Sequence, residues 1–86
     1  MPTVTLYTTA HCPYCIRARN LLDKKGVEYN DIRIDEKPEM REEMERLSNG
    51  VTSVPQIFID DFHVGGFDDL AELDMDGELD KRLGLS

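Results

Sequence analysis

Residues 3–34 read TVTLYTTAHCPYCIRARNLLDKKGVEYNDIRI, and this stretch decides the fold. Residues 3–7 alternate polar and apolar side chains and are rich in β-forming residues, so they predict a strand. Apolar residues then recur at helical spacing over residues 13–25, and Gly26 is a natural helix terminator. Residues 27–34 are again rich in β-formers. This order predicts two parallel strands joined by a right-handed helical crossover.

The next stretch predicts a second helix and a hairpin. The helix is expected to begin near Pro38, because proline is favoured in the first helical turn, and to end at the Asn-Gly pair of residues 49–50. Residues 56–59 and 62–66 are short β-rich runs on either side of two aspartates. That arrangement is typical of two antiparallel strands joined by a tight turn.

The last stretch, residues 67–83, has the pattern of a helix. Asp68 is suited to cap its start, and Gly77 is expected to break it into two pieces. The complete order is then β-α-β-α-β-β-α. It predicts an α/β fold in which a four-stranded mixed sheet is flanked by helices, formed as a single domain by residues 1–86.

Charge and hydropathy disfavour two classes of partner. The chain carries 18 acidic and 10 basic side chains, and residues 60–86 hold only two of the basic ones, Lys81 and Arg82. Nucleic-acid binding is disfavoured because phosphate contacts need clustered Lys and Arg. No apolar run approaches the roughly 20 residues that span a membrane, and the N-terminus lacks the pattern of a signal peptide. We therefore expect a cytoplasmic protein, in a compartment where thiols are kept reduced.

Residues 11–15, HCPYC, hold both cysteines of the chain, Cys12 and Cys15. Such a pair serves a metal, a structural staple or a redox reaction. Tetrahedral zinc takes four ligands, and the chain offers one cysteine pair with two isolated histidines, His11 and His63, so no metal site is expected. A structural disulfide is not expected in the cytosol. A two-residue cysteine spacing at the mouth of a β-α-β unit favours redox catalysis.

The start of the first helix explains how the pair would work. Cys12 is expected at its N-cap, with Pro13 at the first helical position. The free amides of Tyr14 and Cys15, together with the helix dipole, then point at the Cys12 sulfur and favour its thiolate. Cys15 lies one turn later, faces inward and would keep an ordinary thiol. We therefore expect Cys12 to attack and Cys15 to resolve the mixed disulfide.

Three motifs in this order resemble the dithiol glutaredoxins, most closely the small bacterial members. They are CPYC at the first helix, SVP before the third strand and GGFDDL at the last helix, with REEM and PQIFID as further likeness. The resemblance covers essentially the whole chain. It implies the thioredoxin fold and an enzyme that reduces protein disulfides and glutathionylated mixed disulfides. It also implies glutathione as co-substrate, with no tightly bound cofactor.

The resemblance places a glutathione site on matching positions. A cis peptide bond before Pro55 would present the Val54 backbone to glutathione, which would pair with it like an added strand. Gly66 and the glycine before it would let the ligand approach the backbone closely. The amides of Phe67 and Asp68, at a helix start, would hold the γ-glutamyl carboxylate.

Four further side chains complete the implied site. Asp68 or Asp69 would pair with the amino group of glutathione, although both also suit a helix start, Asp68 as the cap and Asp69 as a first-turn acid. Tyr14 would flank the thiols. Arg41 is a candidate for a glutathione carboxylate or, alternatively, an exposed helix arginine. Thr9 stands where many members have a lysine that holds such a carboxylate, so weaker glutathione binding is expected.

Three other functions stay open at this point. Thr9 and Phe67, which replaces a cysteine of bacterial relatives, favour a redoxin reduced by thioredoxin reductase, whereas the acids of GGFDDL argue for glutathione. A dimer holding an iron–sulfur cluster through Cys12 and glutathione is disfavoured by the stiff Pro13 and the second thiol. A non-catalytic interaction module would not need the cysteine pair. We expect a monomer whose partners are glutathione and glutathionylated or disulfide-bonded proteins.

Overall fold

The computed structural model describes residues 2–85. In chain order their elements are β1 (Val4–Thr8), α1 (Pro13–Lys24), β2 (Asn30–Arg33), α2 (Glu39–Leu47), β3 (Gln56–Ile59), β4 (Phe62–Gly65), α3 (Phe67–Met75) and α4 (Glu78–Leu83). The strands form one sheet in the order β2-β1-β3-β4. β1 pairs with β2 in parallel and with β3 antiparallel, and β3 and β4 form an antiparallel hairpin. The predicted β-α-β-α-β-β-α order is confirmed.

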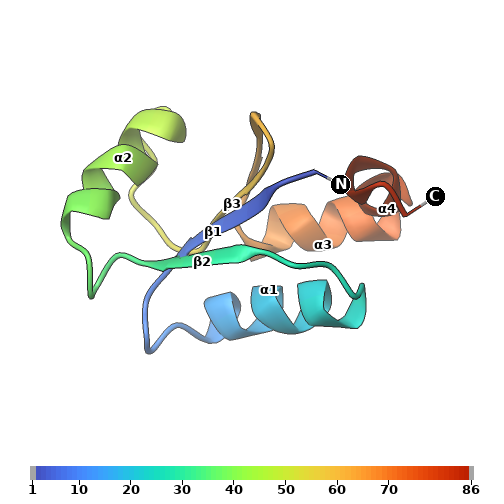
Figure 1. Ribbon diagram of the computed structural model, residues 1–86, viewed down its shortest axis with the longest axis horizontal. Coiled ribbons are helices and arrows are strands. Elements are labelled where there is room, and N and C mark those ends of the chain that lie inside the picture. Colours follow the sequence, from blue (N-terminus) through green and yellow to red (C-terminus); the bar gives the residue numbers. More distant parts are fainter. Residues whose placement is uncertain (1, 86) are drawn as a thin grey trace.

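The helices cover the sheet on both faces. Figure 1 shows α1 and α3 on one face and α2 on the other. The alternation of β1 explains both contacts, because Leu6 packs with the α1 and α3 side while Tyr7 packs with Met44 of α2. The larger cluster contains Val4, Leu6, Ala18, Leu22, Val27, Ile57, Ile59, Val64, Leu70, Leu79 and Leu83.

The second strand is shorter than the sequence predicts. β2 spans Asn30–Arg33 instead of residues 27–34. Gly26 turns the chain with a φ of 74°, and the Val27 amide still donates to the Leu22 carbonyl at the end of α1. Val27 and Tyr29 lie in the connection between α1 and β2, and both pack on the core. Their spacing therefore resembles the alternating pattern of a strand.

The break in the last helix is confirmed. Gly77 has a φ of 77°, in the left-handed region that favours glycine, and it separates α3 from α4. Leu79 and Leu83 of α4 are fully buried. Among residues 2–85, none of the helices combines the length and the apolar character needed to cross a bilayer.

Candidate active site

Cys12 caps the first helix, as predicted. It has extended backbone angles at the N-cap of α1, and Pro13 occupies the first helical position. Its sulfur accepts a hydrogen bond from the Cys15 amide at 3.2 Å and lies 3.8 Å from the Val54 carbonyl oxygen. The Cys12 sulfur therefore sits between a helix N-terminus, which favours negative charge, and the loop that precedes Pro55.

Cys15 occupies a different environment one turn later. Its side chain is fully buried, whereas 9% of Cys12 is exposed. Burial first, and then the hydrogen bond with the Cys12 side chain, raise the pKa of the Cys15 thiol to about 12. Cys15 is therefore a protonated thiol at neutral pH. Both cysteines are free thiols, and Cys12 is the more exposed of the two.

A cleft with a volume of about 380 Å³ opens beside the loop that contacts Cys12. The Val54–Pro55 peptide bond in its wall is cis, as the family resemblance implies. The cleft brings together seven of the residues predicted from the sequence with five others. Its lining residues are Tyr14, Val51, Ser53, Val54, Pro55, Gln56, His63, Gly65, Gly66, Phe67, Asp68 and Asp69.

Asp68 and Asp69 have different tasks, and the prediction that Asp68 caps the last helix is wrong. The N-cap of α3 is Gly66, and its amide donates to the Asp69 carboxylate at 3.0 Å. Glycine has no side chain to accept from the first helix amides, so only the second bond of a capping box forms, in which the acid three positions later accepts from the N-cap amide. Asp69 also restricts Gly65, where a β-carbon would collide with its carboxylate. The exposed Asp68 carboxylate is left to face the cleft.

Thr9 and Arg41 lie outside the lining of the cleft. Thr9 follows the end of β1, and its backbone lowers the pKa of the Cys15 thiol, against the larger effect of burial. Arg41 of α2 donates to the Thr52 carbonyl oxygen at 3.3 Å. Arg41 therefore contacts the loop that leads to Val54, and its guanidinium supports the cleft wall from outside.

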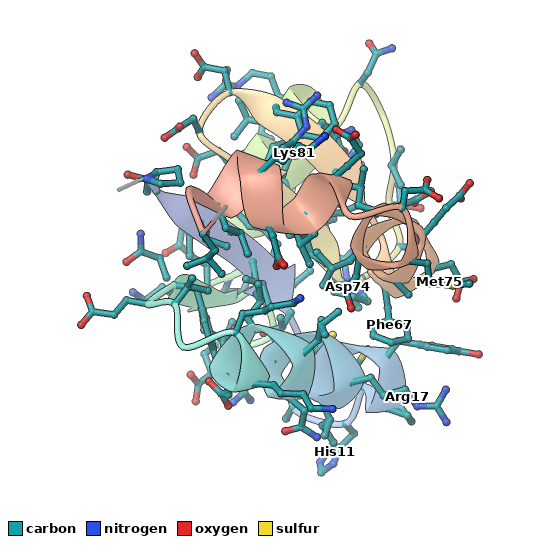
Figure 2. All side chains as sticks on the ribbon, turned by 90° about the vertical axis from the view of Figure 1, so that its right-hand side faces the viewer. His11, Arg17, Phe67, Asp74, Met75 and Lys81 are labelled. Carbon is teal, nitrogen blue, oxygen red and sulfur yellow. The ribbon has the colours of Figure 1, made fainter. Side chains whose placement is uncertain are left out.

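An aromatic pair forms part of the cleft lining. The rings of Tyr14 and Phe67 stack with their centroids 6.4 Å apart, and the Arg17 guanidinium carbon lies 5.4 Å from the Tyr14 centroid. Figure 2 shows Phe67 and Arg17 on the same side of the molecule, with His11 at the foot of α1. Tyr14 is 52% exposed, so the pair forms an accessible apolar rim.

The chain matches the family model described as glutaredoxin over residues 4–64. It is 55% identical over 83 residues to a glutaredoxin of Pseudomonas aeruginosa, with 96% of this chain and 98% of that protein covered. The chain belongs to the glutaredoxin family. Glutaredoxins are glutathione-dependent thiol–disulfide oxidoreductases with a CxxC active site, which is CPYC in this chain.

Solved glutaredoxin structures confirm the predicted thioredoxin fold. The solution structure of the Brucella melitensis glutaredoxin is 47% identical and superposes with a TM-score of 0.84, covering 99% of this chain and 91% of that one. The buckwheat glutaredoxin, solved as a complex with glutathione, is 28% identical with a TM-score of 0.86. The superposition covers 96% of this chain and 77% of the buckwheat chain.

Sequence reasoning did not find the polar wall of this glutaredoxin's cleft. The Gln56 side chain is buried and donates from its Nε2 atom to the Ser53 carbonyl oxygen at 3.0 Å, and its Oε1 atom lies 2.6 Å from His63 Nε2. Because the Gln56 amide nitrogen is the donor to Ser53, its oxygen is left to accept from His63. The predicted hairpin could have indicated this contact, because its register places residues of β3 beside residues of β4.

Proposed function

We propose that this glutaredoxin reduces glutathionylated proteins and protein disulfides, with Cys12 as the nucleophile and Cys15 as the resolving thiol. The unequal burial of the two sulfurs supports this assignment most strongly. Cys12 keeps some exposure while Cys15 has none, and burial raises the pKa of Cys15, which keeps it a thiol at neutral pH. Thiolates attack disulfides, so the accessible sulfur at the helix N-terminus reacts first.

Deglutathionylation needs Cys12 alone. The Cys12 thiolate attacks the glutathione sulfur of a protein–glutathione mixed disulfide, and the protein sulfur leaves and takes up a proton. Cys12 is then joined to glutathione. A second glutathione thiolate attacks the glutathione sulfur of this adduct, so that glutathione disulfide forms and the Cys12 thiolate is released.

Reduction of a protein disulfide uses both cysteines. Cys12 attacks one substrate sulfur and forms a mixed disulfide, and the other substrate sulfur leaves as a thiol. Cys15 then attacks the Cys12 sulfur, so the second substrate thiol leaves and a Cys12–Cys15 disulfide remains. Two glutathione molecules reduce this bond and become glutathione disulfide.

The cleft is proposed to bind glutathione next to Cys12. The Val54 backbone would pair with the peptide of glutathione, and the amides of Phe67 and Asp68 at the start of α3 suit its γ-glutamyl carboxylate. The free Asp68 carboxylate suits the amino group, since Asp69 is engaged with the Gly66 amide. Arg41 would act mainly through the loop it supports.

Further proposals concern the setting of the protein. We infer that residues 1–86 act as one domain, because the helices pack on one sheet, and we propose that the protein acts as a monomer. We infer the cytoplasm as the compartment, because a free, closely spaced thiol pair suits a reducing environment.

The test is turnover of a glutathionylated peptide with glutathione, glutathione reductase and NADPH as the reducing system. We expect the native protein and Cys15→Ser to turn over and Cys12→Ser to be inactive. With a disulfide-bonded protein as substrate, Cys15→Ser should also lose activity. Turnover by folded Cys12→Ser would contradict the assignment of the nucleophile. A folded, reduced native protein without turnover would contradict the proposed glutathione site.

A further inference from the structure

A polar residue is buried beneath the first turns of α1. Val4, Leu6 and Thr8 lie on the same face of β1, toward α1 and α3. The first two belong to the apolar core, whereas Thr8 brings a hydroxyl group and is fully buried. A buried hydroxyl is costly without hydrogen-bond partners, so its partners identify its task.

Arg19 and Asp31 are those partners, and the three side chains form a closed triangle. Arg19 donates from Nη2 to Thr8 Oγ1 at 2.9 Å and from Nε to Asp31 Oδ2 at 2.6 Å. Thr8 donates from Oγ1 to Asp31 Oδ1 at 2.5 Å. Only 21% of the Arg19 side chain and 28% of the Asp31 side chain are exposed. Because the guanidinium is planar, two fixed acceptors determine its position and orientation.

The arginine of this triangle shares a face of α1 with the buried thiol. Arg19 follows Cys15 by four residues on α1, so both lie on one helix face, and helix side chains lean toward the N-terminus. The backbone of Thr9, the neighbour of Thr8, lowers the pKa of the Cys15 thiol. The charge of Arg19 lowers the pKa of Cys15 and so opposes the effect of burial.

We propose that Arg19, held by Thr8 and Asp31, is a positioning residue for the resolving step, in which its charge stabilises the negative charge that develops on the Cys15 sulfur. The inference rests on the proposed role of Cys15. It assigns no part to Arg19 in deglutathionylation, which uses Cys12 alone.

The resolving step exchanges one disulfide bond for another. In the mixed disulfide, the Cys15 sulfur forms a bond to the Cys12 sulfur, the bond between Cys12 and the substrate sulfur breaks, and the Cys15 proton passes to the leaving thiolate. Cys15 is oxidised and the substrate sulfur is reduced, while the Cys12 sulfur stays at the disulfide level. In the reverse direction, glutathione attacks Cys12 and Cys15 leaves as a thiolate. Arg19 therefore affects the opening of the Cys12–Cys15 disulfide by glutathione in the same way.

The experiment measures that opening directly. The oxidised protein is mixed with glutathione, the reaction is quenched with an alkylating reagent, and the modified species are counted by mass spectrometry. Arg19→Gln should slow the opening by about tenfold, the factor that corresponds to one unit of pKa. Arg19→Lys keeps the charge and should restore most of the rate. Lys24→Gln removes an exposed charge from the same helix and should leave the rate unchanged.

A second measurement separates this effect from a structural role. In a Cys15→Ser background, Arg19→Gln should leave deglutathionylation unchanged. Equal losses with and without Cys15, or no loss in either, would overturn the proposal. If Arg19→Gln does not fold, Arg19→Gln/Asp31→Asn leaves no unpaired carboxylate and should show the same slowing. A Cys15→Ser protein that still reduces protein disulfides would instead refute the resolving role on which the inference rests.

Discussion

The two ends of α1 are held in opposite ways. At the thiol end (Cys12, Cys15 and the cleft), the helix cap is a sulfur that accepts one amide hydrogen bond at 3.2 Å. At the closed end (the last turn of α1 with α3 and α4), Lys25 Nζ lies 2.6 Å from Asp74 Oδ1 and 2.8 Å from Asp80 Oδ1. Figure 2 looks onto the closed end and labels Asp74 there.

The difference shows where this small protein places its stability. Cysteine is not among the preferred helix caps, so Cys12 at the N-cap serves the reaction and makes the helix less stable than a serine or aspartate cap would. The closed end offsets this with two fully buried leucines, Leu79 and Leu83. It also has the ion pair of Lys25 with a buried Asp80 oxygen that has no other partner. Substitutions at the thiol end should therefore change activity, and substitutions at the closed end should change the free energy of unfolding.

The largest expected effect is the loss of activity in Cys12→Ser. Serine lacks the nucleophilic sulfur, so turnover of a glutathionylated peptide should fall to the background rate. Serine is also a preferred N-cap, and the thermal midpoint should not fall. Activity assays and thermal unfolding of the same preparation check both parts. A marked loss of stability would show that the Cys12 side chain also supports the fold.

The matching change at the closed end is Leu79→Ala. The leucine is fully buried between α4 and the core, and its removal should lower the free energy of unfolding by about 2–5 kcal/mol. Denaturant unfolding measures the loss. At a temperature where the variant is folded, its turnover should equal that of the native protein. A lower turnover of the folded variant would contradict the separation of the two ends.

Asp68 and Asp69 provide a matched pair within the thiol end. Asp68→Ala should raise the KM for glutathione by about fivefold, equivalent to about 1 kcal/mol for an exposed charge pair. Asp69→Ala removes the acceptor of the Gly66 amide and should lower the free energy of unfolding by about 1 kcal/mol. Glutathione kinetics and denaturant unfolding of both variants are the measurements. A raised KM in Asp69→Ala together with a loss of stability in Asp68→Ala would contradict both assignments.

The smallest expected effect belongs to Lys25→Gln, which removes both ion pairs at the closed end. The hydrogen bonds with Asp74 and then Asp80 raise the pKa of Lys25 above its ordinary value. Its contribution to stability is thus fully present at neutral pH and is lost as the pH rises through the raised pKa. The thermal midpoint of Lys25→Gln should be lower at neutral pH and approach that of the native protein in strong alkali. Glutathione turnover should not change.

Local signals predicted the thiol end well. Pro13 at the first helical position fixes where α1 begins, so the placement of Cys12 at the N-cap followed from two adjacent residues. Gly77 likewise predicted the break before α4 from its own conformational freedom. The roles of Asp68 and Asp69 were not separable, because the helix cap lies two residues earlier than expected, at Gly66, which has no side chain.

Contacts between distant segments could not be predicted. Lys25 meets Asp74 and Asp80 only after the crossover and both later helices have folded, and many acidic residues were equally plausible partners. The Arg19–Asp31 pair depends on the parallel register that sets Asp31 beside Leu6. Such pairs are properties of the tertiary structure, whereas caps and breaks are properties of a few consecutive residues.

The two thiols, three residues apart, differ in reactivity because Cys15 is fully buried, whereas Cys12 keeps 9% of its surface exposed. The direct measurement is alkylation of the reduced native protein with iodoacetamide over a range of pH, with each cysteine quantified by peptide mass. We expect Cys12 to be modified at neutral pH, and Cys15 to stay unmodified until the pH approaches its pKa of about 12. Modification of both cysteines at similar rates at neutral pH would contradict it.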